Sequence, residues 1–177
     1  MNRYVIISGL PASGKTTLAL ALADVLSLPL FDKDAYLEAL FADRPPATPP
    51  ARSQLSRMAD LTLRENVEHA NGAVVASWWK HPRAGGESGT AVDWLHGLSG
   101  PRVEVHCLCS PQIAVERFLS RTRHPGHFDQ RWSRDELLAR FQRSAALGPL
   151  GIGRLIEVDT HDSPDVEELA QRIRHRL

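Results

Sequence analysis

A segment near the start of the sequence has the residue types needed to hold a phosphate group. Residues 9–16 read Gly-Leu-Pro-Ala-Ser-Gly-Lys-Thr. Small residues let successive backbone N–H groups converge on phosphate oxygens, and a helix that begins here directs its positive end at the same anion. Lys15 adds a cation for the β- and γ-phosphates, and the Thr16 hydroxyl is an oxygen ligand suited to Mg²⁺. We expect a nucleotide to bind at Gly9, Ala12, Ser13, Gly14, Lys15, Thr16 and Thr17.

Two carboxylates follow at a short distance along the chain. Asp32 and Asp34 flank Lys33, which we expect to be solvated. On an extended segment, two acids one residue apart point the same way. One could then hold the water shell of a metal ion while the other accepts the proton of an attacking hydroxyl. The alternative is a turn or a helix cap, for which aspartate is also favoured.

Arginines are concentrated in a later segment. Residues 117–134 contain one acid, Asp129. They contain five arginines: Arg117, Arg121, Arg123, Arg131 and Arg134. Guanidinium groups bind phosphate oxygens and also stack on a purine ring. Solvated helix faces are the alternative. Two histidines in the same segment, His124 and His127, have no nearby third ligand, so we expect no metal site there.

A third candidate region is the segment Ser-Trp-Trp-Lys-His at residues 77–81. Trp78 and Trp79 could stack on the ring or sugar of a second ligand, and Lys80 could meet its negative group. Simple packing against helices is the alternative for both tryptophans. Arg57 and Arg64 are weaker candidates of the same sort.

These residues must be positioned by strands that alternate with helices. Short apolar, β-branched runs predict strands at residues 4–7, 28–31, 73–79, 103–109 and 155–158. Helical spacing and capping signals predict helices at residues 16–26, 35–41, 53–70, 90–98, 111–122, 133–146 and 163–177, with a glycine-rich loop over residues 80–89. Such alternation favours an α/β fold with a parallel sheet of five strands and helices on both faces. Ligands then bind beyond the carboxyl ends of the strands.

Composition limits the possible partners. The chain has 177 residues, enough for one domain, 1–177. Its 21 Lys and Arg balance its 21 Asp and Glu, so no net field draws it to nucleic acid or to a membrane surface. No apolar run approaches the roughly 20 residues of a membrane helix, and the N-terminus lacks the pattern of an export signal. We expect a cytoplasmic protein.

The phosphate-binding segment resembles that of P-loop nucleotide-binding proteins. More narrowly, the chain resembles compact P-loop kinases of small molecules, a group that includes shikimate kinase, gluconate kinase and chloramphenicol phosphotransferase. The resemblance rests on Gly-Leu-Pro-Ala-Ser-Gly-Lys-Thr-Thr-Leu-Ala, the Asp-x-Asp pair, the arginine-rich segment and Val-Asp-Thr at residues 158–160. Residues 121–128 are similar to the lid of gluconate kinase, but Phe-Asp-Lys-Asp-Ala-Tyr-Leu replaces its Gly-Asp-x-Leu-His, so gluconate is not implied.

The resemblance implies a three-layer P-loop fold, with ATP and Mg²⁺ as cofactors and an arginine-rich lid at about residues 117–134. It assigns Asp32 to magnesium and Asp34 to the substrate hydroxyl. It also places Arg121 and Arg123 nearest the nucleotide and Thr160 beside adenine.

The activity so implied is transfer of the γ-phosphoryl group of ATP to a hydroxyl of a small molecule, with Lys15, Asp34, Arg121 and Arg123 as catalytic residues. A polynucleotide 5′-kinase is one alternative, which the zero net charge disfavours. A nucleotide-binding switch with little catalysis is another, which Asp34 and the lid disfavour.

Overall fold

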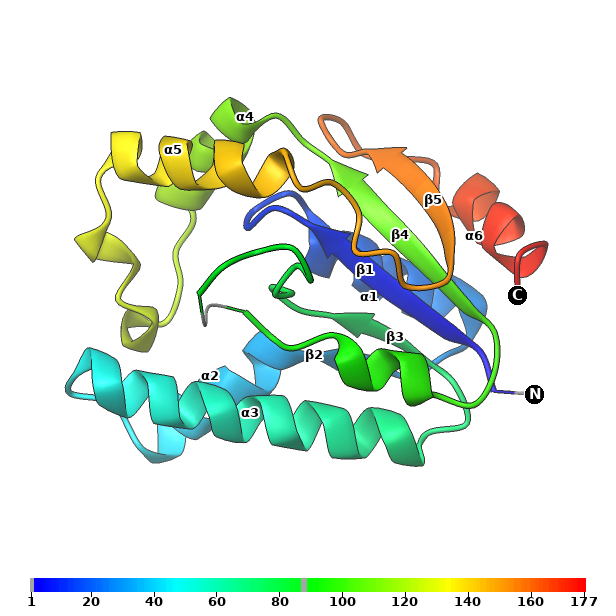
Figure 1. The fold of residues 1–177 in the computed structure, drawn as a ribbon, viewed down its shortest axis with the longest axis horizontal. Coiled ribbons are helices and arrows are strands. Elements are labelled where there is room, and N and C mark those ends of the chain that lie inside the picture. Colours follow the sequence, from blue (N-terminus) through cyan, green and yellow to red (C-terminus); the bar gives the residue numbers. More distant parts are fainter. Residues whose placement is uncertain (1, 87–88) are drawn as a thin grey trace.

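A computed structural model describes residues 2–86 and 89–177 of the chain. Five strands form one parallel sheet in the order β2-β3-β1-β4-β5 (Figure 1). Their bounds are β1 Tyr4–Gly9, β2 Leu30–Asp32, β3 Ala73–Ala76, β4 Arg102–Leu108 and β5 Arg154–Asp159. The predicted five-stranded parallel sheet is confirmed. The predicted loop at residues 80–89 includes Glu87 and Ser88, which lie outside the described residues.

Helices cover both faces of this sheet. α1 (Lys15–Leu26) and α6 (Val166–Arg174) pack on one face, and α3 (Pro49–His69) packs on the other. α2 (Lys33–Asp43) packs on α3, while α4 (Pro111–Ser120) and α5 (Arg134–Ala145) pack on each other. No helix among the described residues is both long enough and apolar enough to cross a bilayer.

The central strand explains this layering. In β1, Val5 and Ile7 face α1 and α6, whereas Tyr4 and Ile6 face α3. All four are buried because β1 pairs with a neighbour on each side and is covered on both faces. A strand of this kind is a continuous apolar run rather than an alternating one. Its first polar residues therefore appear at its carboxyl end.

Several predicted element boundaries were wrong, and the third strand, predicted to reach residue 79, ends at Ala76. α3 begins at Pro49 rather than residue 53, because Thr48 accepts a hydrogen bond from the Ala51 amide and two prolines occupy the first turn, where a missing N–H costs nothing. Only a short 3₁₀ helix, Asp93–Gly97, forms within residues 90–98. The last helix is capped by Asp165, not opened at residue 163.

A buried carboxylate fixes the loop that leads into β5. Glu104 on β4 is fully buried and accepts hydrogen bonds from the backbone amides of Leu150, Gly151 and Ile152 at 2.8, 2.9 and 3.1 Å. The Ser8 hydroxyl also donates to it at 2.6 Å. Since Ser8 immediately precedes the phosphate-binding segment, Glu104 connects that segment to the loop that leads into β5.

Loss of this carboxylate should destabilise the fold. Glu104→Ala would leave three backbone amides, including that of the buried Ile152, without their acceptor, so we expect the free energy of unfolding to fall by about 3 kcal/mol or more. Urea unfolding followed by tryptophan fluorescence measures this change. Glu157→Ala, at an exposed position on β5, is the control and should change stability by less than about 0.5 kcal/mol. Equal stability of the two variants would contradict the role assigned to Glu104.

Candidate functional site

A large cavity lies beyond the carboxyl ends of the strands. Its volume is about 1520 Å³, and it is bordered by the segments that follow β1, β2, β3 and β5 and by residues of the arginine-rich segment. Pockets for one small ligand are usually about 300–1,000 Å³. The cavity therefore has room for a nucleotide and a second small molecule together.

The phosphate-binding segment curls at one wall of this cavity. Gly9 has a φ of 132°, and a Cβ there would lie 2.8 Å from the Cys107 carbonyl oxygen, so only glycine fits. The Lys15 ammonium donates to the carbonyl oxygens of Gly9 and Leu10 at 3.1 and 2.6 Å. Burial lowers the pKa of Lys15 to about 8. Its charge is held by neutral acceptors alone, which leaves it available to an anion.

The other predicted nucleotide contacts divide into two groups. Ala12, Gly14, Thr16 and Thr17 border the cavity together with Lys15. Gly9 and Ser13 lie behind them; Ser13 is buried, and its hydroxyl has no hydrogen-bond partner among the described residues. Their nucleotide contacts stay predictions.

An oxygen pair next to Lys15 fits a magnesium ion. The Thr16 hydroxyl donates to Asp32 Oδ2 at 2.9 Å, and both residues border the cavity. Burial raises the pKa of Asp32, and the hydrogen bond from the Asp34 amide opposes part of that rise. A nearby cation would favour the charged carboxylate. Mg²⁺ prefers hard oxygen ligands and takes only one or two from the protein when phosphates and waters supply the rest.

The two aspartates are brought together in a different way from the one expected. Asp32 ends β2 and caps α2 by accepting from the Asp34 amide at 3.0 Å, whereas Asp34 lies in the first turn of α2. They therefore do not share an extended segment, although both border the cavity. Lys33 is not solvated as predicted: it is buried, and its ammonium lies 2.7 Å from Asp60 Oδ1 on α3.

Two arginines of the arginine-rich segment contact carboxylates in the cavity. Arg123 forms ion pairs with Asp34 and, at 3.2 Å, with Asp129. Arg121 Nη2 lies 3.7 Å from Asp129, and its guanidinium stacks over the ring of Phe118 at 4.4 Å. Both arginines border the cavity, and both guanidinium groups form ion pairs with acidic side chains. An incoming phosphate would compete with these carboxylates for the same donors.

The remaining three arginines of this segment have different surroundings. Arg117 donates to the carbonyl oxygens of Thr160 and His161 at 2.8 and 2.6 Å, which fixes the loop after β5. Thr160 borders the cavity, but its hydroxyl donates to the Leu108 carbonyl. Arg131 also borders the cavity, whereas Arg134 forms an ion pair with Glu116 at the surface.

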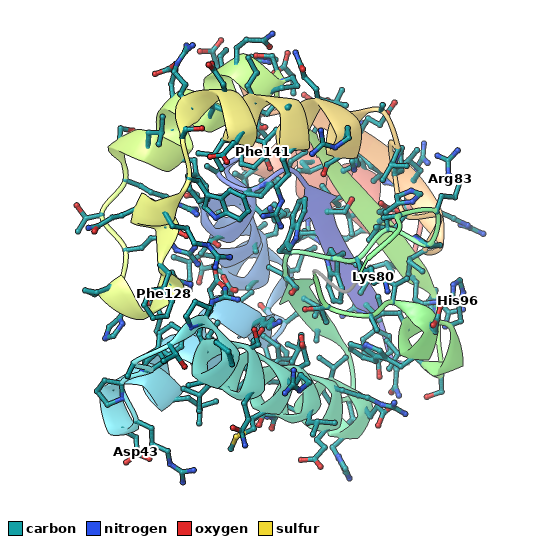
Figure 2. The ribbon with its side chains drawn as sticks, turned by 60° about the vertical axis from the view of Figure 1, so that its left-hand side comes forward. Asp43, Lys80, Arg83, His96, Phe128 and Phe141 are labelled. Carbon is teal, nitrogen blue, oxygen red and sulfur yellow. The ribbon has the colours of Figure 1, made fainter. Side chains whose placement is uncertain are left out.

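The two histidines attach the tip of the arginine-rich segment to α2. His127 is buried, with Nε2 2.9 Å from Glu38, and the ring of Phe41 contacts both His124 and His127. Gly126 approaches so closely that a Cβ would lie 2.8 Å from Phe41. Figure 2 shows Phe128 near α2 and α3 at this tip, and Phe141 on the inner side of α5. The described residues include no group of three His, Cys, Asp or Glu arranged to hold a metal ion.

Arg52 is a charged cavity residue that the sequence analysis missed. Arg52 on α3 borders the cavity, and its Nε is buried with no hydrogen-bond partner among the described residues. Burial lowers the pKa of Arg52, and the nearby Arg123 lowers it further. A signal was present: Arg52 lies three and seven residues before Leu55 and Ala59, on the face of α3 that is buried. Placing the helix start at residue 53 hid it.

The segment after β3 contributes one tryptophan to the site. Trp78 borders the cavity, and its indole N–H is buried without a partner among the described residues. Trp79 instead packs in the core and donates to the Ile7 carbonyl at 2.8 Å. Lys80, labelled in Figure 2, lies outside the residues that border the cavity, as do Arg57 and Arg64. Contact of these residues with an acceptor stays a prediction for Trp78 alone.

Comparison with known proteins identifies the fold. The sequence matches no protein-family model and no curated protein. A structure from Chloroflexus aurantiacus, provisionally described as a kinase, is similar over 99% of this chain and 98% of its own, with a TM-score of 0.81 and 26% identity. Shikimate kinase from Bacteroides thetaiotaomicron covers 97% and 96% (TM-score 0.57, 20% identity), and a gluconokinase from Sinorhizobium meliloti covers 96% and 88% (0.54, 20%). The chain has the fold of small-molecule P-loop kinases, as the resemblance implied.

The lowered pKa of Lys15 predicts a pH dependence of stability. In the folded protein the pKa of Lys15 is lowered to about 8, against 10.5 for an unburied lysine. Between these values the unfolded chain binds more protons, so burial of Lys15 makes the free energy of unfolding rise with pH across this window. Between about pH 7.5 and pH 10, we expect the free energy of unfolding of the wild type to increase by roughly 2 kcal/mol more than that of Lys15→Met. Urea unfolding at the two pH values measures this difference. Parallel curves for the two proteins would contradict the burial of this ammonium.

Proposed function

We propose that this chain is an ATP- and Mg²⁺-dependent phosphotransferase that moves the γ-phosphoryl group of ATP to a hydroxyl of a small acceptor molecule. The structural neighbours are kinases, which supports a phosphotransferase. Such an enzyme would act in the cytoplasm, where ATP is available.

The observation that carries the proposal is the meeting of three kinds of group around one cavity. A phosphate-binding loop with Lys15, a carboxylate at Asp34 and the guanidinium groups of Arg121 and Arg123 all border it. Phosphoryl transfer needs charge neutralisation, an oriented hydroxyl and little covalent chemistry from the protein. This set of side chains supplies those requirements.

Each residue then has a separate role. Lys15 and the backbone amides around it hold the β- and γ-phosphates, and Thr17 and Thr160 line the nucleotide. Asp34 accepts a hydrogen bond from the acceptor hydroxyl and takes its proton as the hydroxyl oxygen bonds to the γ-phosphorus. The bond between that phosphorus and the bridging oxygen breaks in the same transfer, and ADP leaves. For this to happen, Arg123 must exchange its contact with Asp34 for one with the transferring group. Movement of the Arg123 guanidinium toward the phosphate would therefore also free the Asp34 carboxylate.

Thr16 and Asp32 are the residues that would hold Mg²⁺. When bound, the ion supplies positive charge beside the phosphate oxygens and so stabilises the charge that develops during transfer. The raised pKa of Asp32 fits this role, because its half-buried carboxylate would be stabilised in its charged form by a nearby cation.

The acceptor end of the cavity favours a polar and negatively charged molecule. The buried Arg52 Nε and the buried indole N–H of Trp78 have no partner among the described residues. Buried donors without acceptors are costly, so a ligand that supplies oxygen acceptors here would gain affinity. A hydroxylated carboxylic acid or a phosphorylated metabolite has this chemistry.

Replacing the loop lysine tests the nucleotide site. Lys15→Ala should leave the fold intact yet lower turnover by about a hundredfold or more, since an electrostatic contact to the transferring phosphate is lost. Circular dichroism checks the fold, and calorimetric titration of Mg·ATP into the well-folded protein checks binding. Wild-type protein that gives no heat with Mg·ATP would refute the nucleotide site altogether.

Replacing the proposed base separates catalysis from nucleotide binding. Asp34→Asn keeps the size of the side chain but cannot accept the proton, so phosphoryl transfer should slow by about a hundredfold or more while the affinity for Mg·ATP changes little. Single-turnover transfer and ATP titration measure the two effects. Equal losses in both would make Asp34 a nucleotide ligand instead of a base.

The acceptor itself can be found by a screen. Sugar acids, nucleosides and hydroxylated antibiotics are added one at a time, and ADP release is followed in a coupled assay with the Asp34→Asn variant as the blank. An acceptor-dependent rate supports the proposal. ADP release that no compound stimulates would favour a nucleotide-binding switch.

A further inference from the structure

A chain of buried polar contacts runs beside the cavity and plays no part in the roles above. The Lys33 ammonium lies 2.7 Å from Asp60 Oδ1, and the Thr90 hydroxyl donates to the same oxygen at 2.7 Å. The Ser77 and Thr90 hydroxyl oxygens are 2.5 Å apart. Lys33, Ser77 and Thr90 are all buried. One carboxylate therefore receives contacts from two different parts of the chain.

The direction of each hydrogen bond follows from the available protons. A threonine hydroxyl has one proton, and a carboxylate only accepts. Because Thr90 gives its proton to Asp60, the contact between Ser77 and Thr90 must be donated by Ser77. The order is Ser77 to Thr90 to Asp60, with Lys33 donating to Asp60 from the other side.

Asp60 thus joins the two sides of the acceptor space. Lys33 lies between Asp32 and Asp34, so its buried ion pair fixes the first turn of α2 from which Asp34 projects. On the other side, the Thr90 amide donates to the Trp78 carbonyl at 2.8 Å, and the Lys80 amide donates to the Thr90 carbonyl at 2.8 Å. The segment that carries Trp78 is therefore held by both the side chain and the backbone of Thr90.

The helix that carries Asp60 is itself anchored. Its neighbours Ala59 and Leu63 are completely buried, and α3 packs on both α2 and the sheet. A carboxylate on such a helix has little freedom to follow its partners. The partners must instead adopt positions that suit the carboxylate.

We propose that Asp60 is a positioning residue, which sets the distance between the base Asp34 and the acceptor wall at Trp78 through Lys33 and Thr90. The proposal rests on the function proposed above for Asp34. Transfer between oriented groups is sensitive to displacements of about 1 Å, which can cost on the order of a hundredfold in rate. ATP binding does not depend on this distance.

The test compares four variants. Asp60→Leu removes both contacts, and Lys33→Met/Asp60→Leu also removes the ammonium that would otherwise stay buried without a partner. Asp60→Asn keeps an oxygen acceptor. Glu68→Gln, in an exposed ion pair with Arg64 on the same helix, is the matched control. Kinetics use the acceptor found in the screen, and thermal unfolding measures stability.

A positioning role predicts a separation of stability from turnover. Asp60→Leu should lower kcat/KM for the acceptor about tenfold or more, with KM for ATP within about twofold of the wild type. The double variant should regain stability, because no unpaired charge is buried, but not turnover. Asp60→Asn should recover much of the turnover. Recovery of turnover together with stability in the double variant would overturn the proposal and make the contacts purely structural.

A spectroscopic readout is independent of any activity. The indole N–H signal of Trp78, assigned by its loss in Trp78→Phe, should shift in ¹H–¹⁵N spectra of Asp60→Leu and Thr90→Val but not of Glu68→Gln. An unmoved signal in Asp60→Leu would overturn the proposed connection. If the wild type has no acceptor-dependent activity, the proposed function fails, whereas a shifted signal would still support Asp60 as the junction between α2 and the Trp78 segment.

Discussion

Burial of β1 on both of its faces determines where a ligand can reach the sheet. Its side chains are used for packing against α1 on one face and α3 on the other, so no ligand can approach along its length. The chain first becomes accessible where β1 ends at Gly9. Here the Cys107 carbonyl excludes a side chain, and the backbone turns into the loop that leads to α1. Packing of β1 in the core therefore also sets the position of the phosphate-binding loop.

The same constraint concentrates charge at one edge of the sheet. The chain has no net charge, yet nine Lys and Arg residues border the cavity against five Asp and Glu residues. Asp34 and Asp129 neutralise part of this excess through Arg123. An anion bound in the cavity would take over that neutralisation and release Asp34 for chemistry. The ion pair between Arg123 and Asp34 thus links occupancy of the nucleotide site to availability of the proposed base.

Sequence reasoning succeeded for the structural elements that are encoded locally. The segment from Gly9 to Thr16 needs only neighbouring residues to form its loop, and the five strands could be recognised from short apolar runs. It failed where a residue depends on contacts distant in sequence. Arg52 was hidden because the helix start was misplaced by a few residues. Asp34 was assigned to an extended segment with a helix cap as the alternative, and the cap is what forms, with Asp32 as the cap residue.

The two buried lysines illustrate why local pattern is insufficient. From the sequence, Lys15 was expected to bind phosphate groups and Lys33 was expected to be solvated. In the fold, Lys15 contacts only carbonyl oxygens, whereas Lys33 faces the carboxylate of Asp60. A cation whose hydrogen bonds go to neutral carbonyl oxygens gains more from an incoming anion than one that is already in an ion pair with a carboxylate. A chemical role therefore suits Lys15 and a structural one suits Lys33, and the difference lies in a partner 27 residues further along the chain.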